Sequence, residues 1–293
     1  MTTIDDALAK DRSIPDIDWR VFPDGTVHDV FAAPSGGLAR VRLGDEDAPR
    51  VLLVSGVAGS KEDFVLLFPL FAAAGYRVES YDLAGHYGSV AAGPENLDPP
   101  REHYDYHLFL DDFVAILEDG GRPVHVLGYS FAGLLAELAL VERPDLFASL
   151  TLMAAPPDTG QVFRGVKHIG PISDMPPRRA AGLILWGIRY NLNRTPPLRI
   201  AFVRERMAIT RRPAIDDVVA LMMAMPDIAD EVAGIGIPKL IAVGEQDLWP
   251  TEQHAAYAER IGARMVVYPT GHAPCETAPH QLVRDMLTLF ANA

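Results

Sequence analysis

The sequence contains a single cysteine, Cys275, so no disulfide bond can form within the chain. It also lacks a long apolar run. The longest, around residues 64–75, is interrupted by Pro69 and is shorter than the roughly 20 residues that a membrane-spanning helix needs. The start, MTTIDDALAK, is polar and acidic and has no signal-peptide pattern. We therefore expect a cytoplasmic protein that makes no membrane contact.

Basic residues are scarce, with 26 Lys and Arg against 39 Asp and Glu and a net charge of −13. Nucleic-acid binding needs a surplus of basic residues on one face, so this class of partner is excluded. Histidines and acidic residues do not cluster at the spacing of metal ligands, and we expect no metal or organic cofactor. Hydrophobic residues make up 49% of the chain, which is typical of an ordinary folded protein. The sequence makes no prediction of the oligomeric state.

Short runs rich in Val, Leu and Ile alternate with stretches whose apolar residues lie three and four apart. The alternation predicts an α/β fold with a mostly parallel, eight-stranded, doubly wound sheet and helices on both faces. An antiparallel hairpin at the sheet edge, turning at Gly36-Gly37, is predicted within residues 26–44. The first 20 residues are expected to be a loose lead-in. The predicted strands are 50–56, 76–82, 123–129, 149–155, 239–244 and 264–269, and the predicted crossover helices are 62–74, 106–117 and 131–141.

No strand-like run occurs between Pro156 and Pro238, where the pattern is that of helices interrupted by prolines. We interpret residues 157–235 as an inserted helical lid, called the cap segment below, and residues 1–156 and 236–293 as the core. The cap segment holds 11 Lys or Arg and 8 Asp or Glu, a net charge of +3 against −16 for the rest of the chain.

A serine stands where a predicted strand, VHVLGY, runs directly into the predicted helix that follows Ser130. A nucleophile at such a turn sits on a strained backbone, and the residues two before and two after it must be small. Gly128 and Ala132 meet this requirement. The helix also points its positive end and free N–H groups at the serine, where charge develops when a carbonyl is attacked. Ser130 is therefore predicted as a nucleophile.

A serine hydroxyl is a weak nucleophile and needs a base, which in turn needs a group that orients it. Asp247 and His272 each follow the carboxyl end of a predicted strand, the edge where sites form in parallel sheets. We predict His272 as general base and Asp247 as the orienting acid, with Asp158 as the alternative acid. His125, within a strand, and His254, on a helix, are interpreted as structural.

With these three positions, the chain resembles the α/β-hydrolase superfamily from about Thr26 to its C-terminus. In that family the oxyanion is held by the backbone N–H after the nucleophile and by one from the loop after the third strand. The resemblance implies that Phe131 and Val57 supply these groups. The loop SGVAGS is similar to the family's His-Gly-x-x-Gly turn, but Ser55 stands in place of the histidine. The turn DLAGHYGS is similar to a second family turn, with Ala84 in place of its arginine, and is expected only to shape a loop.

The prediction is thus a serine hydrolase that cleaves a carboxylic ester, lactone or thioester of a small-molecule substrate through an acyl-serine. Two alternatives stay open. One is a carbon–carbon bond hydrolase, cofactor-free lyase or perhydrolase that uses the same triad, and the other is a non-catalytic small-molecule receptor. Trp249, Trp186 and Tyr190 are candidate pocket residues. Cys275 is expected to be a buried small hydrophobe.

Overall fold

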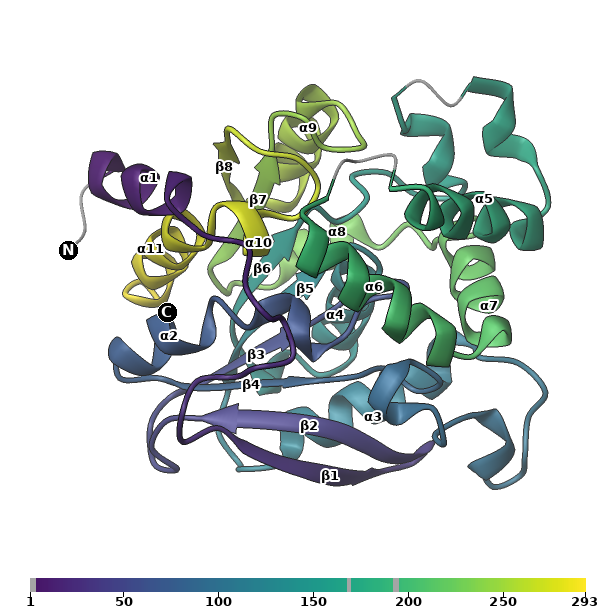
Figure 1. The fold of residues 1–293 in the computed structure, drawn as a ribbon, viewed down its shortest axis with the longest axis horizontal. Helices are drawn as coiled ribbons and strands as arrows, with labels where there is room; N and C mark the ends of the chain where they lie inside the picture. Colours follow the sequence, from purple (N-terminus) through teal and green to yellow (C-terminus); the bar gives the residue numbers. More distant parts are fainter. Residues whose placement is uncertain (1–3, 168–169, 192–194) are drawn as a thin grey trace.

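The computed structural model describes residues 4–167, 170–191 and 195–293, and within them eight strands form one sheet (Figure 1). The strand order across the sheet is β1-β2-β4-β3-β5-β6-β7-β8. β2 pairs antiparallel with β1 and β4, and the remaining neighbours are parallel, as predicted. The strands are β1 (Val27–Ala33), β2 (Gly36–Leu43), β3 (Arg50–Val54), β4 (Arg77–Tyr81), β5 (Val124–Tyr129), β6 (Phe147–Met153), β7 (Lys239–Gly244) and β8 (Arg264–Tyr268).

Helices cover both faces of the sheet because its central strands are apolar on both sides. In β3, Leu52 and Val54 belong to the core beneath α3, α4, α8 and α9, whereas Val51 and Leu53 belong to the core beneath α2 and α11. The helices are α1 (Ile4–Arg12), α2 (Phe68–Ala73), α3 (Tyr106–Glu118), α4 (Phe131–Glu142), α5 (Pro177–Arg189), α6 (Pro197–Ile209), α7 (Arg212–Met222), α8 (Ala229–Gly234), α9 (Thr251–Ile261), α10 (Pro274–Thr277) and α11 (Pro279–Phe290).

Two local expectations were wrong. The hairpin turns at Pro34-Ser35, and Gly36 and Gly37 already pair with Ala33 and Ala32 in the β1–β2 ladder. Proline has no N–H to give to a ladder, so it stands in the turn. The lead-in holds the helix α1, which packs against α11.

The cap segment lies between β6 and β7 in the chain and contains α5 to α8. It packs on loops that follow the carboxyl ends of strands. Lys167 N donates to Leu248 O after β7, Arg211 N donates to Gly85 O after β4, and Val57 after β3 contacts α5 and α7. In Figure 1, α5 and α7 lie on the right and α6 and α8 nearer the middle, whereas α1, α2 and α11 lie on the left. The division into core and cap stays an interpretation of the sequence.

The described residues contain no helix that is both long enough and apolar enough to cross a membrane.

Candidate active site

Ser130 occupies a strained turn between β5 and α4, with φ 52° and ψ −120°. Left-handed φ values are costly for a residue with a side chain and are held only where neighbours fix the backbone. Here Ser130 N donates to Met153 O at 2.9 Å. A Cβ placed on Gly128 would lie 2.5 Å from Ala132 O, so the predicted need for a small residue at this position is met. The serine side chain stands at the carboxyl edge of the sheet.

The loop after β3 lies directly against this turn. A Cβ on Gly56 would come within 2.8 Å of Tyr129 O, 2.9 Å of Ser130 Cβ and 3.3 Å of Phe131 N. Only glycine allows so close an approach of the two backbones. The loop that carries Val57 therefore runs beside Ser130 and the start of α4.

The amides of Val57 and Phe131 are the two predicted oxyanion donors. Within the described parts of the chain, neither amide is assigned a hydrogen-bond acceptor. Phe131 is the first residue of α4, where the helix leaves its N–H groups unsatisfied and carries partial positive charge. Both amides are thus free to bind a developing negative charge, and their role in catalysis stays a prediction.

Asp247 and His272 are brought together by the loops after β7 and β8. Gln246 N donates to Thr270 O at 2.9 Å, and His272 Nδ1 then lies 2.5 Å from Asp247 Oδ1. Burial alone would raise the pKa of Asp247, but hydrogen bonds from His254 and His272 outweigh it and hold the pKa below its ordinary value. An ionised carboxylate only accepts, so Nδ1 carries the proton and the other ring nitrogen is free to take one.

Aromatic rings connect this pair to the nucleophile turn. The ring of Tyr129, the residue before Ser130, lies 5.4 Å from the His272 ring, measured between centroids. Trp249 is fully buried, lies 6.0 Å from the same ring and donates its indole N–H to Val162 O at 2.8 Å. The imidazole therefore contacts two aromatic rings, one of which belongs to the residue that precedes the predicted nucleophile.

His254, interpreted from sequence as structural, contacts the predicted acid. Its Nε2 lies 2.8 Å from Asp247 Oδ2, and its side chain is only 1% exposed. Asp247 thus binds one histidine with each carboxylate oxygen. The seven-residue spacing between Asp247 and His254 gave no sign of this contact, because the contact depends on how α9 folds back over the loop.

A buried ionic network holds the loop that carries Val57. Ser55 Oγ donates to Asp63 Oδ2 at 2.5 Å, and Asp63 Oδ1 accepts from Arg199 and Arg206, both on α6 of the cap segment. Arg199 also binds Glu276 on α10, just after His272. Of these residues, the sequence singles out Ser55 alone. The cap segment is therefore bound to the loop that carries Val57 and to the helix that follows His272.

The other candidates take separate places. Trp186 on α5 and Tyr190 directly after it contact each other and are 52% and 59% exposed, so substrate binding by them stays a prediction. Asp158 is exposed and accepts from Thr159 N, whereas Asp247 lies against His272. Cys275 is fully buried, as expected, and burial raises the pKa of its thiol.

The turn DLAGHYGS, expected to shape a loop, holds two loops together through Asp82. Asp82 accepts from the backbone and side-chain nitrogens of Lys61, each at 2.8 Å, and from Gly88 N at 3.0 Å. The carboxylate therefore joins the loops that follow β3 and β4.

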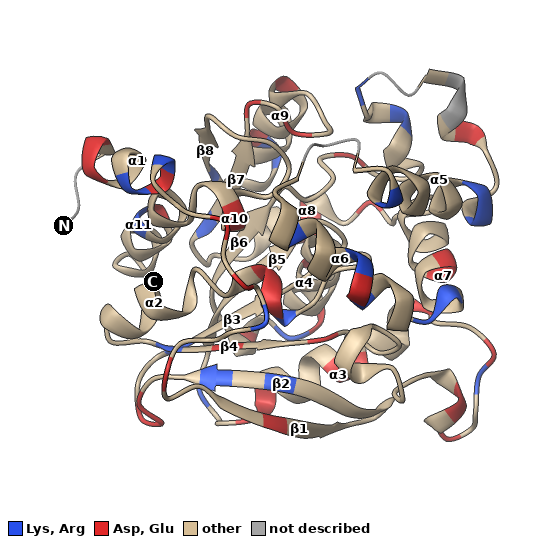
Figure 2. Cartoon of the chain, in the orientation of Figure 1, with Lys and Arg blue, Asp and Glu red and all other residues tan. Residues whose placement is uncertain are grey.

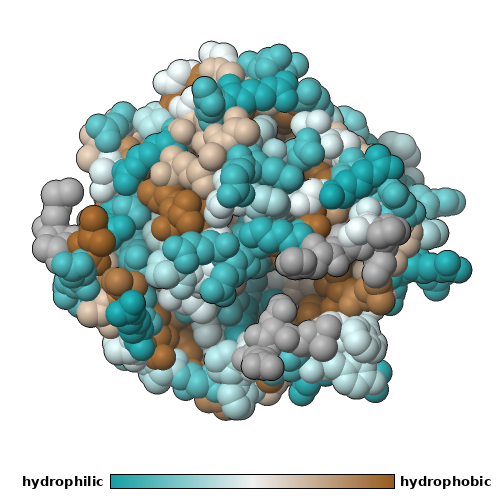
Figure 3. Space-filling view, turned by 90° about the horizontal axis from the view of Figure 1, so that it is seen from above, coloured by the Kyte–Doolittle hydropathy of each residue, from teal (hydrophilic) through white to brown (hydrophobic). Residues whose placement is uncertain are grey.

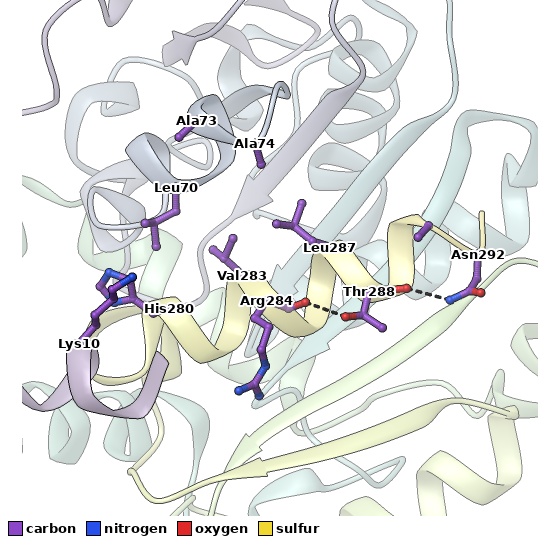
Figure 4. A pocket seen from close by; sticks show the side chains of 11 residues that line it. Lys10, Leu70, Ala73, Ala74, His280, Val283, Arg284, Leu287, Thr288 and Asn292 are labelled. Atoms are coloured by element: carbon purple, nitrogen blue, oxygen red, sulfur yellow. Dashed lines mark hydrogen bonds between the residues drawn. The ribbon is translucent and has the colours of Figure 1, made fainter. Parts of the chain in front are cut away.

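An apolar cavity of about 220 Å³ lies beneath α5, next to the predicted site. It reaches Leu248, the neighbour of Asp247, and Phe163, which shares a hydrophobic cluster with Val57. Leu183 and Leu248 line it and are 46% and 42% exposed. Apolar surface is also visible on the right of Figure 3, the side of the cap segment. A larger groove of about 750 Å³ lies between α1, α2 and α11, as Figure 4 shows, and none of the predicted catalytic residues lines it.

Basic residues are frequent on the cap helices, as the blue segments of α5, α6 and α7 in Figure 2 show. Several of them already have acidic partners. Arg199 and Arg206 bind Asp63, and Arg212 binds Asp216 at 2.6 Å. The positive charge of these side chains is thus compensated within the protein.

A sequence model of the alpha/beta hydrolase family matches residues 51–285, and the chain belongs to this family. Its sequence is 27% identical to strigolactone esterase RMS3 of Pisum sativum over 72% of this chain and 81% of that protein. It is 24% identical to strigolactone esterase D14 of Arabidopsis thaliana, over 80% and 89% of the two chains. A thermophilic esterase of Thermogutta terrifontis has the same fold, with a TM-score of 0.72 at 19% identity over 91% of this chain and 98% of that one.

Proposed function

We propose that this protein is a serine hydrolase that cleaves a carboxylic ester, lactone or thioester through an acyl-serine intermediate. The observation that carries the proposal is the hydrogen bond from His272 to the buried Asp247, beside the strained turn of Ser130. A charge-oriented imidazole next to a nucleophile turn at the carboxyl edge of the sheet is the arrangement that acyl transfer requires.

The proposed reaction has two halves. Ser130 Oγ attacks the acyl carbon while its proton passes to the free ring nitrogen of His272, and the amides of Val57 and Phe131 bind the resulting oxyanion. Collapse of this intermediate breaks the bond to the leaving group, which takes the proton from His272. Water then attacks the acyl-serine and gives a proton to His272. Collapse of this second intermediate breaks the bond from the acyl carbon to Ser130 Oγ, which takes the proton from His272, and the carboxylic acid is released.

The cavity beneath α5 supports an apolar group on the substrate. Its wall is formed almost entirely by carbon, from residues such as Val166, Met175 and Ile184. An apolar lining favours hydrocarbon over charged groups because desolvation of a charge there has no compensation. Both plant relatives are named strigolactone esterases, so simple lactones belong in the substrate panel beside alkyl esters.

The test is hydrolysis of p-nitrophenyl esters and lactones by wild-type protein and by Ser130→Ala. We expect turnover by the wild type and its loss in the variant, with unchanged circular dichroism. Ser13→Ala, which removes an exposed hydroxyl in the loop after α1, is the matched control and should keep full activity. Equal activity of Ser130→Ala and wild type, after identical purification, contradicts the proposal.

The remaining readings correspond to other outcomes of the same experiment. Covalent labelling of Ser130 by a fluorophosphonate probe without turnover of any ester or lactone supports a receptor. Turnover of β-diketones but not of esters supports carbon–carbon bond hydrolysis.

A further inference from the structure

Asp247 is shared between two histidines, of which only His272 has a part in the proposed reaction. Its side chain is completely buried, with Oδ1 2.5 Å from His272 Nδ1 and Oδ2 2.8 Å from His254 Nε2. The two rings bind different oxygens, so they do not compete for one lone pair. The carboxylate is thereby fixed at both ends.

The two histidines differ in their surroundings. The His272 side chain is 25% exposed, whereas that of His254 is 1% exposed. His254 also makes an edge-on contact with the ring of Trp249, with centroids 6.5 Å apart. His254 is therefore enclosed behind Asp247, where no substrate reaches it, and His272 is the ring that is open to solvent.

We propose that His254 is a positioning residue that holds Asp247 in the orientation needed to align His272. This inference rests on the proposed function. Because the pKa of Asp247 is held low, the carboxylate is ionised near neutral pH and His254 Nε2 must be the donor. Donation to Oδ2 stops rotation of the carboxylate about its Cβ–Cγ bond and keeps Oδ1 on the Nδ1–H of His272. The same bond weakens the basicity of Asp247, so the proton stays on His272.

The helix that carries His254, α9, is hydrogen-bonded to α4. Three residues after His254, Tyr257 donates to Glu137 of α4 at 2.6 Å, and α4 is the helix that begins directly after Ser130. The helix that carries His254 is therefore fixed to the helix that follows the nucleophile. A positioning group on α9 has a defined location relative to Ser130.

The experiment compares His254→Phe, which removes the donor, with His254→Gln, whose amide N–H can replace it. We expect His254→Phe to lower kcat about 10- to 100-fold with KM changed less than about threefold, since a buried charged acceptor loses a partner. His254→Gln should recover most of the loss. His280→Phe removes a histidine–aspartate bond outside the site, to Asp11 at 2.8 Å, and should leave kcat unchanged; His280 is labelled in Figure 4.

A spectroscopic measurement separates this inference from the proposed function. The Nδ1 proton of His272 should give a far-downfield ¹H NMR signal, assigned by its loss in His272→Gln. In His254→Phe the signal should shift or broaden by exchange, and in His254→Gln it should stay near the wild-type position. This readout needs no turnover, so an inactive wild type overturns the proposed function alone. A folded His254→Phe protein with the wild-type signal, or with wild-type kcat where there is turnover, overturns the positioning role.

Discussion

Ser55 donates its hydroxyl to Asp63 across eight residues of the loop that follows β3, at 2.5 Å. A Cβ on Gly59 would lie only 1.8 Å from this hydroxyl oxygen, so the glycine leaves the space that the bond occupies. The α/β-hydrolase turn that this loop resembles, His-Gly-x-x-Gly, has a histidine in the place of Ser55. Here a short hydroxyl and a buried carboxylate hold the loop that presents the Val57 amide.

Asp63→Asn should strongly destabilise the fold. Burial acts to raise the pKa of Asp63, but Arg206 and Arg199 outweigh it and hold the pKa below its ordinary value, so the carboxylate is charged in the folded state. The neutral amide would leave two buried guanidinium groups without their shared counter-charge, at a cost of about 3–5 kcal/mol of unfolding free energy. Urea denaturation measures the loss.

The control for this prediction is Asp174→Asn, in the exposed ion pair with Arg164. Exposed pairs contribute about 0–1 kcal/mol, so this change should be almost silent. Ser55→Ala, which removes one hydrogen bond to the same carboxylate, should cost about 1–2 kcal/mol. Equal stability of Asp63→Asn and Asp174→Asn would show that the network does not hold the cap segment.

Gly56→Ala should damage catalysis more than stability. The added methyl group would meet Tyr129 O and Ser130 Cβ, both closer than 3.0 Å, and must push the loop and its Val57 amide away from the nucleophile. Loss of one oxyanion donor lowers kcat by about 100- to 1,000-fold. Steady-state kinetics with a p-nitrophenyl ester measure it. The control is Gly236→Ala, where a Cβ meets nothing within 4 Å, and it should be fully active. Full activity of Gly56→Ala would show that the loop has no part in catalysis.

The strands and their end residues could be predicted because their signal is local. β3 and β7 are buried along their whole length and consist mostly of Val, Leu, Ile and Ala, and β7 begins and ends at the predicted residues. Asp247, His272 and Ser130 then follow from their places after such strands, since parallel strands bring their carboxyl ends to one edge. Asp247 and His272 meet at this edge through a hydrogen bond, whereas the catalytic part of Ser130 stays a prediction.

His254, Arg199 and Arg206 could not be found in the same way. Each lies on a helix whose sequence looks like an ordinary amphipathic or charged helix, and its partner is fixed only by how that helix packs. The helix α1 was missed for a similar reason. Its Asp11 accepts from the backbone N–H groups of His280 and Gln281 at the start of α11, a contact 269 and 270 residues away in the chain.

Glu137 should make stability fall as pH rises. Burial raises its pKa to about 8 from an ordinary value of 4.5, and the hydrogen bond from Tyr257 only partly opposes this. Between these two values the folded state keeps the proton and the unfolded state loses it, so unfolding becomes easier with increasing pH, by about 1.4 kcal/mol per pH unit. Glu137→Gln keeps the side-chain shape and removes the titration.

Urea denaturation of both proteins between pH 5 and 8 measures this difference. Glu137→Gln should gain stability relative to the wild type with each step in pH. Glu142→Gln, an exposed position at the end of the same helix, should run parallel to the wild type. Parallel curves for Glu137→Gln as well would mean that Glu137 is not protonated in the folded protein.

Ala180→Phe should change the preference for the length of the substrate chain. Ala180 lines the 220 Å³ apolar cavity on α5, and a phenyl group there fills part of it. If the cavity takes the hydrocarbon end of the substrate, the variant should lose kcat/KM for p-nitrophenyl octanoate about tenfold or more, since each excluded CH₂ forfeits about 0.8 kcal/mol. Hydrolysis of the acetate ester should change little. Leu248→Ala enlarges the same cavity and should shift the preference the opposite way, toward longer chains. A uniform loss across all chain lengths in Ala180→Phe would place the hydrocarbon end elsewhere.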